Sequence, residues 1–363
     1  MRGDLSGRYV MPVPRNPSIA WARARAFVAR MDLAVWAAKP LMMAWFTVYQ
    51  SRVLSRLGPW TVVPLREAQL RLDLTEMHDV RVYAAMSHRG AYEPETSALL
   101  AELLTRGDSF VDVGANNGYF TVLASQLVGP TGTVLAVEPN PRALERLEQN
   151  LRLNGLDHQV RVVSAAAGHR EGTRSLYVSG FEDGWASLVP DPSAREVVRV
   201  QVVPLDGLLT GLRTLVLKID AEGSEPEILR GLDQVLRSSE SVAVILEWNR
   251  KFSSAELWHH LRERFRVRQI VPAAVEPGFA LEEIRRWEQL RDVLVSNLLL
   301  TSGPRWDRDL GHGASLGEAL RPSQGPVGGA GPGASTGDPA TRATVTSERD
   351  RMRLEAAVLE EPP

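Results

Sequence analysis

The sequence predicts an α/β protein whose central sheet is doubly wound, mostly parallel and seven-stranded, with an N-terminal helical extension and a disordered C-terminal tail. Three observations support this prediction. Short apolar runs alternate with helical patterns over residues 91–301, residues 1–90 lack that alternation, and residues 302–363 are rich in glycine, proline, serine and threonine. Helices that separate short buried strands imply a parallel sheet with both faces covered.

The alternating elements follow one another in a regular order. The expected strands are Ser109–Gly114, Gly132–Glu138, Val160–Ala166, Thr214–Asp220, Ser241–Trp248 and Asp292–Leu300. The expected helices are Glu93–Gly107, Gly118–Gly129, Pro141–Gly155, Ser224–Leu236 and Ser253–Phe265. Two further β-like runs, Thr173–Gly180 and Arg195–Val203, flank a loop at residues 181–191. Such an order is Rossmann-like and predicts ligand binding at the carboxyl ends of the strands.

The two ends of the chain differ from this domain. Residues 18–57 read as mostly helical, and Gly58 and Pro59 break that pattern before a short mixed segment. The apolar stretch 33–49 is shorter than the roughly 20 residues a membrane span needs, and Lys39 and Pro40 interrupt it. We therefore do not expect an integral membrane protein, although peripheral membrane contact through residues 33–49 stays open. The tail 302–363 cannot bury enough apolar surface to fold, so we expect disorder.

Composition excludes several classes of function. The formal net charge is −2, and no basic stripe points to a nucleic-acid partner. Cysteine is absent, which removes disulfides and thiolate metal sites and fits a cytoplasmic location. Zinc, Walker and nucleophile-elbow motifs are missing, and the scattered histidines have no metal-ligand spacing. The oligomeric state is not predicted.

The turn after the first strand carries the strongest signal for a ligand. It reads Asp112-Val-Gly114-Ala-Asn116-Asn117-Gly118. Glycines there permit a tight turn and a close approach of the backbone to a ligand, and asparagines tolerate turn conformations. Asn116 stands where a dinucleotide-binding turn has its second glycine, the residue that admits a pyrophosphate. The turn therefore favours a ligand without a pyrophosphate.

Three other strand ends carry charged residues. Glu138, followed by Asn140, ends the second strand about 20 residues beyond the turn, where a carboxylate can bind the ribose hydroxyls of an adenosine. Lys218, Asp220 and Glu222 lie at the end of the fourth main strand, and Glu247 lies at the end of the fifth. Charges at the mouth of a buried parallel strand are costly unless they are paired or used, so we select these four residues as the candidate catalytic group.

Together these motifs resemble the FkbM family of methyltransferases. The stretches that carry the resemblance are YEPETSALLAELLTRGDSFVDVGANNGYFT, VLAVEPNPRALERLEQNLRLNG, VLKIDAEGSEPEILRG and ILEWN, which span about residues 90–250. The resemblance implies S-adenosylmethionine as cofactor and a methyltransferase domain at residues 91–301. It also implies O-methylation of a sugar, glycan or secondary metabolite.

The resemblance also assigns roles to residues. The implied donor-binding residues are Glu93, Asp112, Gly114, Asn116, Asn117, Gly118, Glu138, Asn140, Ala165 and Ala166. Asp220 and Glu222 are implied near the transferred methyl group, and the loop around Trp185 and Ser187 is implied to face the acceptor.

Other interpretations remain open on the sequence. An NAD-dependent oxidoreductase would use the same turn and acidic residue, and a non-catalytic Rossmann-like scaffold would keep the fold alone. Asp220, with Glu222 or Glu247, could serve as the base that accepts the hydroxyl proton or could orient the acceptor. Mg²⁺ held by the same carboxylates is a less favoured hypothesis, and we assign no metal ligands.

Overall fold

The computed structural model describes residues 51, 54, 57–179, 186–192, 194–209, 211–273, 278–291, 293, 295–307 and 310. The expectations for the apolar stretch 33–49, for Trp185 and for residues 311–363 fall outside the described residues.

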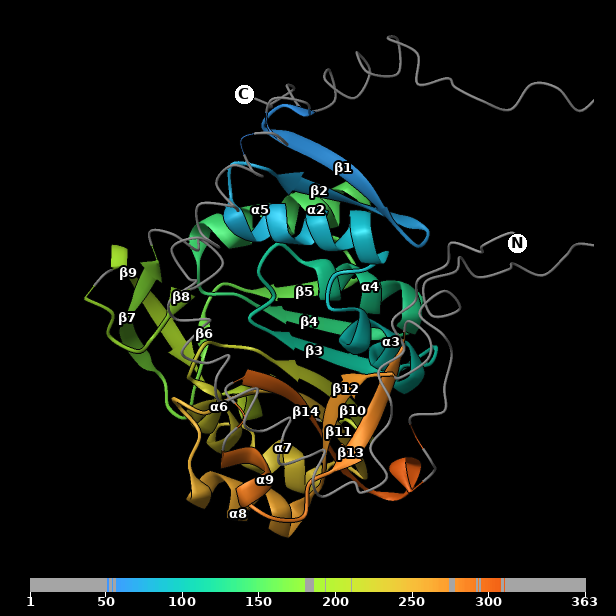
Figure 1. Cartoon of the computed structure of the whole chain (residues 1–363), viewed down its shortest axis with the longest axis vertical. Coiled ribbons are helices and arrows are strands. Elements are labelled where there is room, and N and C mark those ends of the chain that lie inside the picture. Colours follow the sequence, from blue (N-terminus) through green and yellow to red (C-terminus); the bar gives the residue numbers. More distant parts are fainter. Residues whose placement is uncertain are drawn as a thin grey trace, which may run out of the picture. The chain divides into compact units, whose positions relative to one another are not determined.

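Eight strands of the described chain form the central sheet, in the order β13-β12-β14-β11-β10-β3-β4-β5 (Figure 1). Their bounds are β3 Ser109–Val113, β4 Thr133–Val137, β5 Val160–Val163, β10 Thr214–Ile219, β11 Ser241–Asn249, β12 Arg266–Pro272, β13 Phe279–Glu283 and β14 Val295–Ser302. The strands from β5 to β11 run parallel, and β14, β12 and β13 pair antiparallel. This confirms the Rossmann-like α/β fold.

The sheet has eight strands where seven were expected, and β12 and β13 are not among the runs named as strands from the sequence. The additional pairing arises at the edge, where β12 pairs with both β14 and β13. The sequence of β12, RVRQIVP, does not alternate polar and apolar residues strictly, and its buried residues Val267 and Ile270 enter opposite cores. Because the period-two pattern of a strand is missing and the run follows a helix directly, the sequence does not indicate this strand.

Alternate residues of the central strands enter two separate cores. Phe110 of β3 belongs to a cluster with the helices α4 (Tyr119–Val128) and α5 (Pro141–Leu153). Val111, the next residue, belongs to a cluster with the helices α6 (Glu225–Arg230), α7 (Asp233–Ser238) and α8 (Ala255–Arg264). Both faces of the sheet are therefore covered, as a near-continuous apolar run in a strand predicts.

A small four-stranded sheet follows β5, in the order β6-β9-β7-β8. Its strands are β6 Ala166–Ala167, β7 Gly172–Ser179, β8 Ala186–Ser187 and β9 Ala194–Val203. The long antiparallel pair of β7 and β9 confirms the two β-like runs expected from the sequence.

The segment before the domain is not a separate helical extension. After Gly58 the chain forms the antiparallel hairpin β1 (Trp60–Leu65) and β2 (Ala68–Asp73), then α2 (Met77–Arg89). Leu70 and Leu72 of β2 are fully buried in the same cluster as α4. The described part of this segment, from β1 to α2, therefore shares the core of the domain that was expected to begin at residue 91. α3 (Pro94–Leu103) follows it directly.

The domain also continues beyond its expected end at residue 301. After β14 the chain makes a short 3-10 turn, Pro304–Trp306, in which the Trp306 side chain is 2% exposed. The Arg305 guanidinium lies 2.5 Å from the Asp108 carboxylate and donates to the Leu103 carbonyl. The expected start of the disordered tail at residue 302 is thus too early. None of the described helices is long and apolar enough to cross a membrane.

Candidate active site

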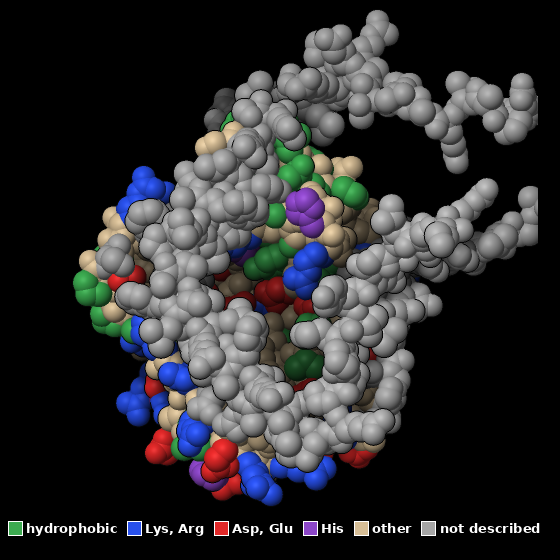
Figure 2. Space-filling model, viewed as in Figure 1, with side chains coloured by type: hydrophobic (Ala, Val, Ile, Leu, Met, Phe, Trp, Pro, Cys, Tyr) green, Lys and Arg blue, Asp and Glu red, His purple; other side chains and the backbone are tan. Residues whose placement is uncertain are grey.

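A cleft opens at the carboxyl ends of β3, β4 and β10, with about 920 Å³ of empty space that includes its open mouth. This is the edge where the strand order reverses between β3 and β10, the usual ligand-binding position in such sheets. Figure 2 shows acidic side chains gathered in the hollow of the described surface. Of the residues predicted from the sequence, those that line the cleft are Glu93, Gly114, Asn116, Asn117, Glu138, Ala166, Lys218, Asp220 and Glu222.

Gly114 allows two strand ends to meet. Its φ of +80° is unfavourable for residues with a side chain, and a Cβ there would lie 1.9 Å from the carbonyl oxygen of Asp220. Asp112 is 1% exposed and does not line the cleft; its Oδ2 accepts a hydrogen bond of 2.6 Å from Thr121 Oγ1. The prediction that Asp112 lines the cleft is therefore wrong. Its hydrogen bond with Thr121 instead connects β3 to the helix that follows the turn. Gly118 does not line the cleft either. It is the N-cap residue of α4 and has a φ of +87°.

Glu138 joins the ends of β3 and β4. Its Oε2 accepts from the backbone N–H of Asn116 at 2.8 Å, and its Oε1 accepts from the backbone N–H of Asn140 at 2.8 Å. Burial raises the pKa of Glu138 to about 7, although both N–H donors oppose that rise. Each carboxylate oxygen keeps a second lone pair, so the group can also accept from the two hydroxyls of a ribose. Asn140 does not line the cleft; it caps α5 through a hydrogen bond from Arg142 N.

One wall of the cleft is apolar. This wall consists of Ala166 and Ala167 of β6, together with Leu176 and Leu188. A flat, uncharged group such as adenine fits surroundings of this kind. Ala165 is buried but does not line the cleft, so the predicted pair Ala165 and Ala166 is displaced by one residue.

Lys218 lies at the centre of the acidic residues. Its side chain is 4% exposed, and Nζ is 2.7 Å from Asp220 Oδ2 and 4.7 Å from the centre of the Phe120 ring. Burial alone would lower its pKa, but Asp220, Glu93 and Asp112 outweigh burial and raise it. The ammonium therefore stays protonated, and Lys218 can organise charge but cannot accept a proton.

Glu93 faces the same group from the other side of the cleft. It precedes α3 with a φ of +40°, and its Oε2 accepts from Asn297 Nδ2 at 3.1 Å. Burial raises its pKa, and Lys218 opposes that rise. Two cleft carboxylates, Glu93 and Asp220, thus share the field of one lysine.

Three carboxylates gather at the ends of β10 and β11. Asp220, Glu222 and Glu247 each offer an oxygen, and the three oxygens lie within 4.8 Å of one another. Burial, followed by repulsion from Asp220, raises the pKa of Glu247 to about 8. Glu247 is set behind the lining residues, whereas the other two face the cleft. Oxygen ligands in this arrangement also suit a hard divalent cation, so the Mg²⁺ hypothesis keeps a structural basis.

Glu225 stabilises the loop before α6 through backbone hydrogen bonds, as expected for an acidic residue in the first turn of a helix. Its Oε1 accepts from the backbone N–H groups of Ala221 and Gly223 at 3.0 and 3.1 Å. Ser187, in the loop expected to face the acceptor, donates to the Glu222 carbonyl at 2.6 Å.

Sequence reasoning missed one wall of the cleft completely. His78 and Arg81 of α2 and Tyr92 line it, although α2 lies before the recognised motifs. Burial lowers the pKa of His78 to about 3, so its imidazole is neutral. The spacing of His78 and Arg81 puts them on one face of a helix, but nothing in the sequence says where that face points.

Comparison with known proteins agrees with this site. Residues 112–271 match the profile of the Methyltransferase FkbM domain. "Methyltransferase 1" of Beauveria bassiana is 28% identical over 149 residues, which cover 35% of this chain and 59% of that protein. "Ribosomal protein L11 methyltransferase" of Bacillus cereus is 27% identical over 208 residues, which cover 56% of this chain and 63% of that protein. The chain thus spans about three-fifths of the length of these curated relatives.

A solved structure of "Methyltransferase FkbM" from Methylobacillus flagellatus is also similar. It is 16% identical with a TM-score of 0.36, and the match covers 62% of this chain and 54% of that one. So low a score carries no argument, and the family assignment rests on the profile match and on the motifs within it. That match favours a methyltransferase over an NAD-dependent oxidoreductase. Residues 112–271 therefore match the FkbM family of methyltransferases, and the match indicates S-adenosylmethionine as the cofactor.

Proposed function

We propose that this chain transfers the methyl group of S-adenosylmethionine to a hydroxyl oxygen of a small-molecule or glycan acceptor, such as a sugar or a secondary metabolite. The observation that carries the proposal is that one cleft is lined both by a ribose-type carboxylate, Glu138, and by Asp220 and Glu222 of a separate group of carboxylates. The first suits the donor, and the second can receive the proton that an alcohol loses.

The residues fit the donor on two grounds. Gly114 lines the cleft at a point where a Cβ would clash with the Asp220 carbonyl oxygen, and the apolar wall at Ala166 lines the same cleft as Glu138. When bound, S-adenosylmethionine supplies an electrophilic methyl group on a positively charged sulfur. The acidic end formed by Asp220 and Glu222 offers a complementary charge.

Asp220 is the residue we propose to receive the proton. The acceptor oxygen forms the bond to the methyl carbon, the carbon–sulfur bond breaks with its electron pair left on sulfur, and the hydroxyl proton passes to the carboxylate. The Lys218 ammonium at 2.7 Å orients that carboxylate. Glu222 faces the cleft beside it and can accept a second hydroxyl of a diol.

The test is a transfer assay with S-adenosylmethionine labelled in its methyl group and a panel of hydroxylated sugars, oligosaccharides and metabolites. We expect label in an ether-linked methyl group for at least one class of acceptor, and a fall of about a hundredfold or more in turnover for Asp220→Asn. Glu240→Gln changes an exposed carboxylate that pairs with Arg213 and should keep full turnover.

The outcomes separate the parts of the proposal. Full turnover by Asp220→Asn would refute its role as the base, and label found on nitrogen or carbon would refute O-methylation. Turnover that survives exhaustive chelation would remove Mg²⁺, whereas loss of turnover restored by Mg²⁺ would favour it.

We also propose a cytoplasmic location, which the cysteine-free sequence supports, and no nucleic-acid partner, because the net charge is −2. Fractionation of cells that produce the chain, with detection in the soluble and membrane fractions, tests the location. Recovery with membranes would contradict it and favour contact through residues 33–49.

A further inference from the structure

We propose that Asp79, on a helix that precedes the family domain, is a positioning residue that holds the donor-binding turn in its working shape. The inference rests on the proposed function for its consequence, weaker donor binding, but its structural part concerns the turn alone. Nothing in the profile match reaches α2, since the match begins at residue 112.

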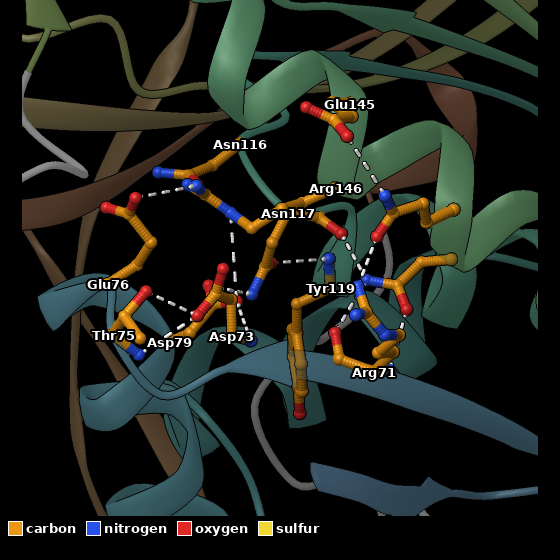
Figure 3. A network of polar contacts seen from close by, with 12 residues as sticks. Arg71, Asp73, Thr75, Glu76, Asp79, Asn116, Asn117, Tyr119, Glu145 and Arg146 are labelled. Carbon is orange, nitrogen blue, oxygen red and sulfur yellow. Dashed lines mark hydrogen bonds and ion pairs between the residues drawn. The ribbon is translucent and has the colours of Figure 1, made fainter. Parts of the chain in front are cut away.

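Asp79 is fully buried and accepts hydrogen bonds at both carboxylate oxygens. Asn117 Nδ2 donates to Oδ1 at 2.9 Å, and the backbone N–H of Asp73 donates to Oδ2 at 2.8 Å. Figure 3 shows the Asp79 side chain between the turn and the end of β2. One carboxylate therefore joins the hairpin to a residue that lines the cleft.

A second link passes through Arg146 of α5. Its guanidinium Nε lies 3.7 Å from Asp79 Oδ2, and its Nη2 donates to Asn116 Oδ1 at 3.5 Å. Asn116 in turn donates its backbone N–H to Glu138. The charge of Asp79 thus orients the guanidinium beside the two residues expected to bind the donor.

The backbone of the turn is held from the opposite side by Asn150. Its Nδ2 donates to the Asn117 carbonyl at 2.8 Å, and its Oδ1 accepts from the backbone N–H of Arg71 at 2.7 Å. Asn117 is therefore fixed by its side chain to α2 and by its carbonyl to α5. Asn116 has a φ of +49°, a sparsely populated region for residues other than glycine, so this turn benefits from such contacts.

The substitution Asp79→Asn keeps the size of the side chain but changes its chemistry. An amide cannot accept at both ends, so one donor, Asn117 Nδ2 or Asp73 N, loses its partner. Arg146 also loses one of its two nearby carboxylates and keeps only Glu76, at 3.7 Å. Because a hydrogen bond to a charged group stabilises a folded structure more than a neutral one does, its loss should weaken the turn, and we expect the Kd for S-adenosylhomocysteine to rise about tenfold. At saturating donor we expect turnover within about threefold of the wild-type value, because Asp79 does not line the cleft.

The test has two readouts on the full chain. Hydrogen–deuterium exchange in the absence of ligand should be faster in a peptide covering residues 112–118 of Asp79→Asn, and calorimetry with S-adenosylhomocysteine should show the weaker Kd. Glu95→Gln changes a half-exposed ion pair with Arg89 and should alter neither readout. Leu72→Ala leaves a cavity under the same hairpin and controls for a general loss of stability.

Each outcome decides something. Faster exchange in the turn with a raised Kd, both absent in Leu72→Ala, supports the positioning role. Unchanged exchange, or a Kd equal to that of the wild type, overturns it. If the wild type binds no S-adenosylhomocysteine while exchange still rises in Asp79→Asn, the donor function fails but Asp79 still positions the turn.

Discussion

The pKa of Glu138 predicts that donor affinity depends on pH in a defined direction. Burial raises this pKa to about 7, so a proton is half-bound near neutrality in the free protein. Two ribose hydroxyls can both donate only to the ionised carboxylate. The proton must therefore leave before the donor binds in full, and affinity should rise as the pH rises through 7.

The size of the effect follows from the fraction of the competent form. If only the ionised group binds, the apparent Kd is the intrinsic Kd divided by the ionised fraction. With a pKa of about 7, that fraction is about one-tenth at pH 6 and about nine-tenths at pH 8. The Kd should thus be about tenfold higher at pH 6, equivalent to about 1.4 kcal/mol.

Calorimetry with S-adenosylhomocysteine at pH 6, 7 and 8 measures this directly. S-adenosylhomocysteine is used because it lacks the positive charge of S-adenosylmethionine. That charge would make the affinity depend also on the titration of Glu247, whose pKa is about 8. Buffers of different ionisation enthalpy should reveal about half a proton released per binding event at pH 7. The charged groups that most affect Glu138 are Arg146 and Asp112, and both stay unchanged in the variant used as control.

Glu138→Gln provides that control. Glutamine cannot titrate, so its Kd should be raised at every pH but should not change between pH 6 and 8. A tenfold dependence that persists in Glu138→Gln would assign the titration to another group. A wild-type Kd that is flat over this range would refute the reasoning from burial.

Two further predictions concern the frame around the cleft. Gly114→Ala should weaken S-adenosylhomocysteine binding about a hundredfold while the far-ultraviolet circular dichroism stays unchanged, because a Cβ 1.9 Å from the Asp220 carbonyl oxygen forces the two strand ends apart; affinity within threefold of wild type would contradict this. Arg305→Met should lower the free energy of unfolding by about 1–2 kcal/mol in urea titrations without changing that Kd, because its partly exposed ion pair with Asp108 attaches residues 304–306 to the domain far from the turn. An unchanged unfolding midpoint would show that this attachment contributes nothing.

The parts of the site that the sequence predicted are those made by neighbours in the chain. The turn from Asp112 to Gly118 joins a strand to the helix that follows it, so its glycines and asparagines identify it locally. Glu138 is recognisable for the same reason, as the last polar residue of a short apolar strand. The errors at Asp112 and Ala165 have different causes. Asp112 lies inside β3 and bonds to Thr121 of the following helix, whereas the strand expected to reach Ala166 ends at Val163, so Ala165 lies between β5 and β6.

What could not be predicted depends on contacts between distant residues. Asp79 and Asn117 are 38 positions apart, and their hydrogen bond exists only because β2 packs on α4 and α5. The hairpin itself has a visible signal in AQLRLD, where apolar and polar residues alternate, but a helical reading of the preceding region obscured it. The end of the domain was missed because Arg305 and Trp306 are isolated residues in a stretch whose composition suggests disorder.

Lys218 is charged although burial alone would disfavour its ammonium form, because the surrounding carboxylates stabilise that form. Without it, the carboxylates of Glu93, Asp112 and Asp220 would have no shared cation to offset their mutual repulsion. With it, Asp220 has a hydrogen-bonded cation at 2.7 Å, and Glu222 adds a further carboxylate beside that pair. Under the proposed reaction these carboxylates distinguish S-adenosylmethionine from S-adenosylhomocysteine, because methyl transfer removes the positive charge from sulfur. The attraction between the acidic residues and that charge therefore acts before transfer and is lost afterwards, which favours release of the product.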